Sequence, residues 1–598
     1  MTINDSYYCL VTTAIKNFWD KDNKLLFLGS WCLTNEEGFF DLNNSLIETS
    51  PWKPLIVASP WYPSTKRGDA FNYCHSLYEM AITKLSTRLN ELHGVSCPDK
   101  YWRILIGPWL FNYILVLFDR YKRLEKALDT FPSLYTYVLP KEKGSLVSYS
   151  IDDFMFGGFG KVRNDLYNHL LFSIIAHEIC PENIIEKDYG CEIKANVIRR
   201  GWKRKIFNVL KSPIDKGFRG SILLNEMYHI SLKELFMLKV KTGFNRLNFV
   251  EMFGSSLPDN MLLIDKYSKD MRTTLKINCT GSGFESILFK TIPEAIPICY
   301  IEDYRYHKNK IKTMDNLKFI GAVVGWNYND VFKFYSAESL LKGATLAEFQ
   351  HGGGHGLSRF DSTYTSASEK DIFYSWGWTD KKRKNVKPLP SPYLSRLINT
   401  YTGRLNKILM VGTDVERYIY KINDSLFPDD KTVYFHDKMR FLAALKKTPR
   451  SRIMYRPGKE VGWKEVDYIM TICPTIEIVK KKKLMHWMQN AKVVVSDYSG
   501  TSFLEALIIN VPTVLFWDHE VFLMRSDAEP YLQALRDAGI LYKDPVSAAE
   551  KVNEIYDNPG EWWLSDKVQD ARKEFCRRFA YARRDWIDVW VKELRKFN

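Results

Sequence analysis

The sequence predicts an α/β protein built on doubly wound parallel sheets. In the second half of its 598 residues, short and continuously apolar runs alternate with helical patterns. Many of these runs end at glycine, proline or small polar residues, as strands do before a turn. Hydrophobic residues make up 45% and aromatic residues 14% of the chain, which excludes a disordered or collagen-like protein.

The alternation begins near residue 318. Strands are expected at 318–326, 345–350 and 371–378, and a helix at 327–341 separates the first two. The proline-rich stretch 387–392 indicates a linker before a new unit.

After this linker the alternating pattern restarts. Its expected strands are 406–413, 451–457, 475–479, 492–498 and 511–517, and its expected helices are 436–448, 483–491 and 499–510. From about residue 566 the chain is expected to be helical to its end. We therefore expect two domains, 1–400 and 401–598, with a ligand-binding cleft between them at the carboxyl ends of strands.

The first 300 residues have a weaker pattern. Strands are expected at 24–31 and 53–60, a helix at 77–94, and a short helix or loop followed by a strand at 292–304. The apolar run 104–118 is shorter than the roughly 20 residues of a membrane-spanning helix, so we expect a core helix that starts near Pro108. The N-terminal domain is thus predicted to carry helical insertions.

The net charge bears on the possible binding partners, and the cysteines bear on the cellular compartment. The net charge is 85 − 70 = +15, which suits nucleic acid, an anionic membrane face or an anionic substrate, although the dense runs at 381–384 and 480–483 are also typical of solvated loops. No zinc finger, basic zipper or RNA-binding motif is present, so nucleic acid is not expected. The ten cysteines form no CxxC pair and the N-terminus carries no signal-peptide pattern, which together indicate a cytoplasmic protein with free thiols.

The strongest local motif is the strand, turn and helix at 493–517. Asp497 ends the strand, and the small polar turn 499–502 opens the helix that contains Glu505. Such a turn directs backbone N–H groups outward at a helix N-terminus, where phosphate or carboxylate binds. The alternative is an ordinary capping box formed by Ser502 and Glu505.

Two further motifs follow predicted strands. In HGGGHG, residues 351–356, glycines allow a ligand to approach the backbone between His351 and His355, or they simply form a tight turn. In YRPGKE, residues 455–460, Arg456 and Lys459 suit a phosphate or carboxylate group, or are ordinary surface charges. There is no nucleoside-triphosphate phosphate loop, and the one DxD pair lies in a polar loop at 20–22, so no metal site is expected.

The segment 496–518 resembles the donor-site segment of CDP-glycerol glycerophosphotransferases. HGGGHG takes the place of that group's His-Gly-Thr motif, and YRPGKE takes the place of its Arg-Pro-His-Pro motif. Gly458 and Lys459 replace the His-Pro of that motif, so the phosphate-binding histidine is missing here.

The chain is also similar, over nearly its whole length, to a family of transferases encoded in bacterial O-antigen and surface-polysaccharide loci. The shared segments are 27–32, 106–110, 350–356, 375–378, 499–518, 525–531 and 562–563. A more distant similarity connects it with the Kdo-type transferases of 3-deoxy-ulosonic acids, which use CMP-activated donors.

These resemblances imply a GT-B fold, in which two Rossmann-like domains face each other across a cleft. They also imply a metal-independent glycosyltransferase with no cofactor, whose co-substrate is a nucleotide-activated sugar, with a CMP-ulosonic acid preferred. Its product would be lipopolysaccharide O-antigen, capsule or a related surface glycan, made on a lipid-linked or glycan acceptor at the inner face of the bacterial inner membrane. The alternatives are a CDP-alditol-dependent polyol-phosphate transferase and a non-catalytic GT-B-like scaffold.

The resemblance also assigns roles to particular residues. The donor phosphate is assigned to Ser499, Gly500, Thr501 and Ser502, with Gly352, Gly353, Arg456 and Lys459 around it. His351 is assigned as phosphate binder or acid/base, Asp497 as a group that orders the turn or binds the nucleotide, and Glu505 as a ribose ligand. The acceptor-side base or nucleophile is left open among Glu285, Glu302 and Glu369, and Gly29, Ser30 and Trp31 are expected to line the acceptor side.

Overall fold

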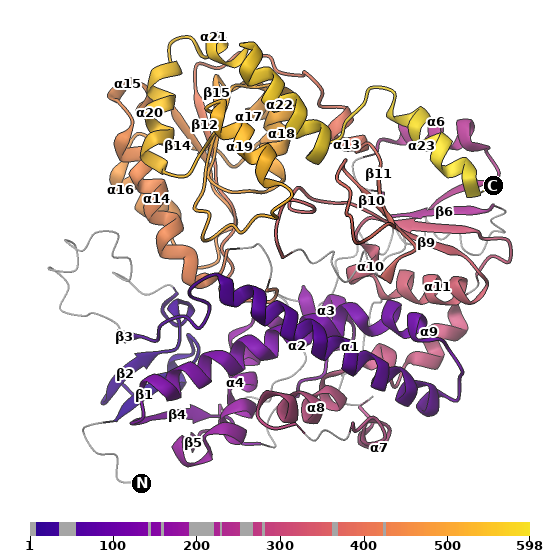
Figure 1. Ribbon diagram of the computed structural model, residues 1–598. Coiled ribbons are helices and arrows are strands. Elements are labelled where there is room, and N and C mark those ends of the chain that lie inside the picture. The colour runs from indigo at the N-terminus through magenta and orange to yellow at the C-terminus, as the bar shows by residue number, and fades with distance from the viewer. Residues whose placement is uncertain are drawn as a thin grey trace.

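The computed structural model confirms an α/β fold with parallel sheets (Figure 1). It describes residues 7–34, 55–141, 145–156, 161–189, 220–227, 230–250, 267–277, 281–311, 313–360, 369–422 and 426–597. These residues form three separate sheets, one of five strands and two of six.

The first sheet has the strand order β3-β2-β1-β4-β5, and every pairing in it is parallel. Its strands are β1 (Tyr8–Val11), β2 (Lys24–Phe27), β3 (Leu55–Ile56), β4 (Leu134–Val138) and β5 (Ile184–Glu186). Its helices are α1 (Thr65–His93), α2 (Asp99–Thr130), α3 (Ile151–Met155) and α4 (Asp165–Ile179). We call this sheet with these helices the first unit.

Helix α2 is the core helix that the sequence predicts, but it begins at Asp99 rather than near Pro108. Pro108 lies inside the helix, and the side-chain amide of Asn112 donates a hydrogen bond of 2.7 Å to the Pro108 carbonyl one turn back. By length and composition α2 also qualifies as a membrane span, yet 83% of its apolar window is buried inside the protein. It packs against α1, α4 and α11 (Asp330–Leu341), so it connects the first unit to the second.

The second sheet has the order β11-β10-β9-β8-β6-β7, again all parallel. Its strands are β6 (Ile222–Asn225), β7 (Leu247–Val250), β8 (Phe319–Ala322), β9 (Thr345–Phe349), β10 (Ile372–Ser375) and β11 (Val386–Pro388). Strand β11 corrects the prediction of a linker that starts at residue 387. It is an edge strand, where the missing N–H of Pro388 is tolerated.

Helices and short turns connect these strands. They include α6 (Leu232–Thr242), α7 (Lys269–Thr273), α8 (Phe284–Ala295), α9 (Tyr304–Lys310), α10 (Gly325–Tyr328), α11 and α13 (Pro392–Ser395). The strand expected within 292–304 is absent, because that stretch holds the end of α8 and a 3-10 turn at Ile298–Tyr300. We call the second sheet with α6, α10, α11 and α13 the second unit.

The third sheet has the order β14-β13-β12-β15-β16-β17, the doubly wound order of Rossmann folds. Its strands are β12 (Ile408–Val411), β13 (Ile453–Arg456), β14 (Glu477–Ile478), β15 (Val493–Ser496), β16 (Thr513–Phe516) and β17 (Leu541–Tyr542). Its helices are α14 (Lys431–Ala444), α15 (Lys447–Arg450), α16 (Glu465–Ile472), α17 (Leu484–Asn490), α18 (Thr501–Ile509), α19 (Glu529–Asp537), α20 (Pro545–Ile555), α21 (Pro559–Trp563) and α22 (Asp566–Phe579). Together they form the third unit.

The last helix, α23 (Trp586–Leu594), leaves the third unit and packs on the second sheet. The Trp590 ring stacks on Phe349 of β9 at 4.8 Å, and its indole N–H donates to the Pro390 carbonyl at 2.8 Å. Two doubly wound sheets tied by a returning helix are the arrangement that the GT-B resemblance implies. The first unit is a further sheet within residues 1–400.

Candidate active site

The turn between β15 and α18 presents the N-terminus of a helix. Gly500 is the N-cap residue, its backbone is extended, and no side chain caps the helix there. Ser502 lies inside the helix and donates to the Tyr498 hydroxyl at 2.5 Å, so the capping-box alternative is wrong. A helix start without a side-chain cap leaves amide donors and a partial positive charge for an anion.

The glycine-rich loop after β9 packs directly on this helix start. The Gly353 N–H donates to the Thr501 hydroxyl at 2.9 Å, although the two residues lie 148 positions apart and belong to different sheets. A Cβ on Gly353 would lie 2.8 Å from a methyl of Leu504 and 2.9 Å from the Thr501 Cα, so a side chain there would require the loop or the helix to shift. The two strongest sequence motifs therefore meet in one place.

His351 follows β9 at the same edge of the second sheet. His355 Nε2 lies 2.9 Å from His351 Nδ1, so the buried His355 orients the exposed His351 ring. Gln350 fixes the base of the loop, because its side-chain oxygen accepts from the Trp376 amide at 2.7 Å and from the Trp378 indole at 2.8 Å. Both flanks of the loop are therefore held, while Gly352 and Gly354 stay partly exposed beside the buried Gly353.

Glu505 lies one helical turn after Thr501. Its carboxylate accepts a hydrogen bond of 2.8 Å from the Tyr393 hydroxyl of the second unit. Burial raises the pKa of Glu505 to about 7, and the Tyr393 hydrogen bond opposes that rise. Ribose binding by Glu505 stays a prediction. What the structure shows is that Glu505 contacts the second unit through Tyr393.

Asp497 lies in a buried polar network beneath the turn. It accepts from the Tyr434 hydroxyl at 2.8 Å and lies 3.3 Å from the Lys438 ammonium, which also pairs with Glu465. Burial raises the pKa of Asp497, and the charge of Lys438 counteracts this rise. The Tyr434 hydroxyl in turn accepts from the Thr413 amide at 3.0 Å. This network ties the loop after β12 to the loop after β15.

A pocket of about 340 Å³ opens at the carboxyl ends of β12 and β13, within the size range of small-ligand sites. It is lined by Thr413, Val415, Phe435, Arg456, Pro457, Gly458, Lys459, Glu460, Trp463, Glu465, Val466 and Lys480. Arg456 donates to the Val479 carbonyl at 2.9 Å, which holds its guanidinium at the rim. A Cβ on Gly458 would lie 2.5 Å from the Thr413 carbonyl, so glycine here lets the two loops meet.

A smaller, mainly aromatic and aliphatic pocket of about 40 Å³ borders His351 in the second unit. Its lining residues are Met227, Ile230, Val323, Phe349, Gln350, His351, Tyr374, Trp376, Leu389, Pro390, Ser391, Pro392, Tyr393 and Trp590. Tyr393 belongs both to this pocket and to the contact with Glu505. The carboxyl edges of the second and third sheets thus each carry a pocket.

The three carboxylates expected on the acceptor side lie in separate places. Glu302 forms an ion pair with the buried Arg272 at 2.7 Å and accepts from the Ser268 amide, which is a structural arrangement. Glu285 starts α8, and its side chain lies 3.5 Å from the Tyr73 hydroxyl.

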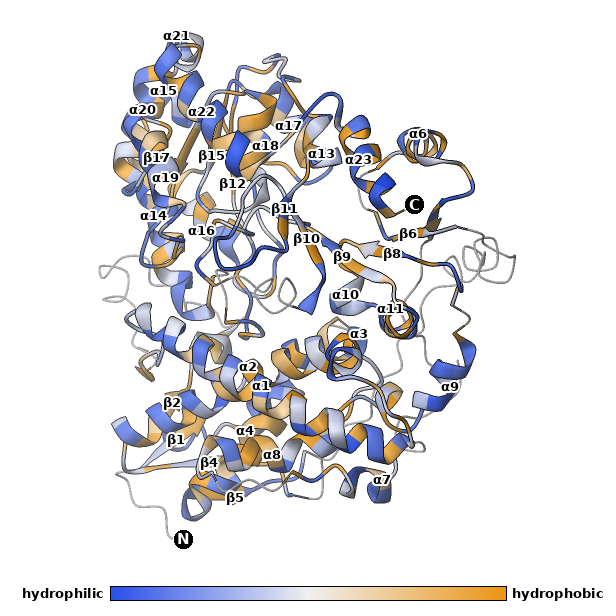
Figure 2. Cartoon of the chain, turned by 45° about the vertical axis from the view of Figure 1, so that its right-hand side comes forward, coloured by the Kyte–Doolittle hydropathy of each residue, from blue (hydrophilic) through white to orange (hydrophobic). Residues whose placement is uncertain are grey.

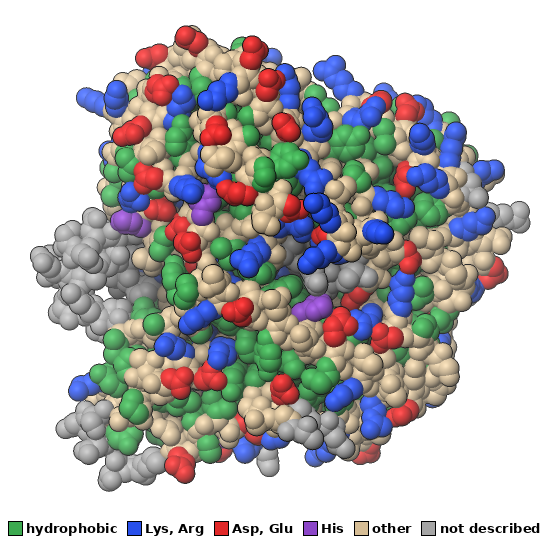
Figure 3. Space-filling view, in the orientation of Figure 1, with side chains coloured by type: hydrophobic (Ala, Val, Ile, Leu, Met, Phe, Trp, Pro, Cys, Tyr) green, Lys and Arg blue, Asp and Glu red, His purple; other side chains and the backbone are tan. Residues whose placement is uncertain are grey.

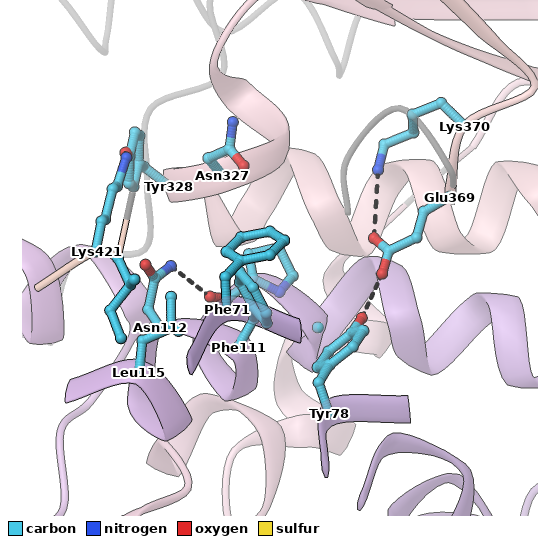
Figure 4. A pocket seen from close by; sticks show the side chains of 13 residues that line it. Phe71, Tyr78, Phe111, Asn112, Leu115, Asn327, Tyr328, Glu369, Lys370 and Lys421 are labelled. Atoms are coloured by element: carbon cyan, nitrogen blue, oxygen red, sulfur yellow. Dashed lines mark hydrogen bonds and ion pairs between the residues drawn. The ribbon is translucent and has the colours of Figure 1, made fainter. Parts of the chain in front are cut away.

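Glu369 lines a third cavity, of about 30 Å³, between α1, α2 and α10 (Figure 4). Its carboxylate accepts from the Tyr78 hydroxyl and lies 3.9 Å from the Lys370 ammonium. Burial raises the pKa of Glu369. Of the three carboxylates, Glu369 is therefore the one that lines a cavity.

The residues expected to line the acceptor side lie at a contact between the first and third units. The buried Trp31 ring lies 5.7 Å from the Tyr418 ring of the third unit, and the Ser30 hydroxyl donates to the Pro428 carbonyl at 3.1 Å. Gly29 faces the Trp31 ring, because a Cβ there would lie 1.9 Å from it. Their positions give no support to an acceptor role, since side chains of the same chain occupy the space around them.

Several residues of the site were missed in the sequence. Tyr393 follows the prolines taken for a linker, and Trp463 lies in an irregular segment after β13. Lys480 stands in the dense lysine run, which by itself indicates no more than a solvated loop. Figure 3 shows Lys and Arg side chains across the middle of the face, where the units meet. Within the described residues, no group of three or more His, Cys, Asp and Glu suits a metal ion.

Comparison with solved structures gives similarity at the level of the fold. Pneumococcal O-GlcNAc transferase GtfA is 11% identical over 49% of this chain and 59% of its own, with a TM-score of 0.33. MurG of Acinetobacter baumannii is 9% identical over 63% and 99% of the two chains, with a TM-score of 0.30. WaaG, a glycosyltransferase involved in lipopolysaccharide biosynthesis, is 10% identical over 63% and 98%, with a TM-score of 0.26. TM-scores this low carry no argument about activity.

No curated protein matches the sequence. A family model described as LIC12162 family transferase matches residues 8–594, which is nearly the whole chain. The protein therefore belongs to the LIC12162 family of transferases.

Proposed function

We propose that this transferase is a glycosyltransferase that uses a nucleotide-activated sugar, with a CMP-ulosonic acid as the preferred donor class. The acceptor is a lipid-linked intermediate or glycan of lipopolysaccharide O-antigen, capsule or a related surface polysaccharide. The observation that carries the proposal is the hydrogen bond between Gly353 and Thr501, which joins the glycine loop to the uncapped helix start. The 340 Å³ pocket opens in the same unit as that helix.

The donor nucleotide would occupy the third unit. Backbone amides at the start of α18 suit the phosphate, because they donate hydrogen bonds and carry the positive end of the helix dipole. Arg456, Lys459 and Lys480 add positive charge at the pocket, and Phe435 and Trp463 supply flat apolar walls for the base.

Transfer itself needs a leaving group and a base. The acceptor hydroxyl oxygen attacks the anomeric carbon, the bond from that carbon to the phosphate oxygen breaks, and the nucleotide leaves with the electron pair. The helix start and the basic side chains stabilise the phosphate charge as it develops. His351, oriented by His355 on the facing unit, is suited to take the hydroxyl proton or to bind the phosphate. This route requires no metal.

The test is a thermal shift of the full chain with CMP, CDP, UDP, GDP and ADP. A ligand at 100 times its Kd adds about 2.7 kcal/mol of stability, which such a measurement detects. Stabilisation by CMP supports the ulosonic-acid donor, whereas stabilisation by CDP favours the alditol-phosphate alternative. UDP or GDP alone would indicate a hexose donor, and no shift with any nucleotide would favour a non-catalytic scaffold.

Two variants localise the nucleotide. Arg456→Gln and Lys459→Ala should each weaken nucleotide binding roughly tenfold or more, since each removes a charge at the pocket. The matched control is Lys407→Ala, which removes a lysine paired with Glu477 on the outside of the third sheet. Equal loss of binding in Lys407→Ala would contradict the proposed location.

A further inference from the structure

Helix α6 has two apolar faces, and only one of them is packed. Its inner face holds the fully buried Leu238, which joins the cluster formed by α23 and the second sheet. On the outer face Leu232 is 85% exposed, Phe236 60% and Val240 53%. These positions are spaced four residues apart, so they form one stripe along the helix. Phe244, 56% exposed, follows just after the helix.

This concentration is unusual within the described part of the chain. Four of its thirteen exposed large hydrophobic side chains fall between residues 232 and 244. Scattered exposed hydrophobic residues are normal, whereas a contiguous group of this kind marks an interaction surface. Figure 2 shows α6 at the outer edge of the second sheet, beside α23.

Basic residues surround the stripe. Residues 231–246 contain four basic side chains and one acidic side chain. The acidic one, Glu234, caps the helix through Ser231. Lys239 lies 4.6 Å from the Phe244 ring, and Lys233 is exposed beside Leu232. The neighbouring chain end adds Arg595, which donates to the Lys241 carbonyl at 2.6 Å.

We propose that α6 docks the protein on an anionic lipid bilayer, with Leu232, Phe236, Val240 and Phe244 inserted at the headgroup boundary. A short helix with an apolar stripe and flanking lysines is the kind of element that lies in a membrane interface. Its positive charge complements anionic headgroups. A two-fold contact centred on Phe236 would bring Lys233 of each copy close to Lys239 of the other, so charge disfavours that occupant.

The position of the stripe fits the rest of the molecule. Met227 and Ile230, which precede α6, line the pocket that borders His351. Docking through α6 would place that pocket next to the bilayer, where a lipid-linked acceptor would be held. This last step rests on the proposed function, whereas the docking itself does not.

The experiment is sedimentation of the full chain with vesicles. Phosphatidylcholine vesicles that contain phosphatidylglycerol should bind the protein, and pure phosphatidylcholine vesicles should bind it at least roughly tenfold more weakly. The double variant Leu232→Ser/Phe236→Ser and the charge variant Lys233→Gln/Lys239→Gln should each lose roughly tenfold or more of the binding. The matched control, Met470→Ser/Leu564→Ser, changes two exposed apolar side chains of the third unit and should bind normally.

Three results would overturn the docking proposal. The first is that the wild-type chain does not sediment with anionic vesicles. The second is that the α6 variants bind as well as wild type, and the third is that the control variant loses as much binding as they do. A dimer in light scattering that dissociates in Leu232→Ser/Phe236→Ser would assign the stripe to a second copy instead. Nucleotide thermal shifts measured on the same variants separate the proposals. Shifts without vesicle binding reject only the docking, and vesicle binding without shifts rejects only the nucleotide-sugar function.

Discussion

The third unit contacts the other two units in very different ways. Its contact with the first unit includes buried ion pairs. Arg67 pairs with Asp430 and Arg123 with Asp429, both at 2.6 Å, and these side chains are at most 12% exposed. Its contact with the second unit includes backbone and small groups, namely the Gly353–Thr501 hydrogen bond and the bridge between Ser358 and Met524. The side-chain contacts there are the Tyr393–Glu505 hydrogen bond and the partly exposed pair of Arg525 and Asp380 at 3.4 Å.

This difference indicates that the two contacts of the third unit have different roles. Buried ion pairs are costly to separate, because either partner alone would be left charged in an apolar surrounding. Backbone amides and a glycine allow a ligand to come close and leave hydrogen-bond donors available beside it. We therefore interpret the first unit as the support of the third unit, and the contact between the second and third units as the place for chemistry.

The largest expected effect comes from breaking the charged contact. Arg123→Met should lower the free energy of unfolding by about 3–5 kcal/mol, because Asp119 and Asp429 both lose a buried partner. Urea denaturation measures this loss. Arg583→Ala is the matched control: its partner Asp585 is exposed, so stability should not change measurably. A loss under about 1 kcal/mol in Arg123→Met would remove the distinction between the two contacts.

The second prediction is that the stability of the protein depends on the protonation of Glu505. Glu505, at the contact with the second unit, has a pKa raised by burial from 4.5 to about 7. Between these values the folded state keeps a proton that the unfolded chain has lost, so stability should fall as pH rises from about 4.5 to 7. The total change is about 3 kcal/mol at most.

Unfolding of wild type and Glu505→Gln across this pH range checks the prediction, and the variant should show a flatter profile. Tyr393→Phe should extend the fall to higher pH, because the lost hydrogen bond favours the ionised carboxylate. Parallel profiles for wild type and Glu505→Gln would show that Glu505 does not titrate as a buried group.

The smallest expected effect probes the glycine loop itself. Gly353→Ala should cost about 1 kcal/mol of stability, because the new methyl group would contact Leu504 and the Thr501 backbone. Gly352→Ala is a close control, since a Cβ there would lie 3.6 Å from the Thr501 hydroxyl, an ordinary contact. If the two variants behave alike in thermal unfolding and nucleotide binding, the tight packing of this loop is not what forms the site.

The strands that could be predicted from the sequence were mainly those buried on both faces of a sheet. Such strands are continuously apolar, so the expected strands at 406–413, 451–457, 492–498 and 511–517 correspond to β12, β13, β15 and β16. The weaker patterns of the first 300 residues hid β1, β4 and the full length of α2. The two-residue strand β17 was also missed, whereas β14 and β3, equally short, lie in longer apolar runs that were recognised.

The sequence by itself determined the alternating architecture and the two motifs of the site, because local apolar period and turn chemistry are properties of neighbouring residues. Only the tertiary structure decided which candidates meet. It brought Gly353 to Thr501, placed Trp31 against Tyr418 of the third unit, and paired Glu302 with Arg272. The sequence does not distinguish a glutamate that faces a cavity from one that pairs with an arginine. The partner comes from a distant part of the chain, and the packing of the whole fold selects it.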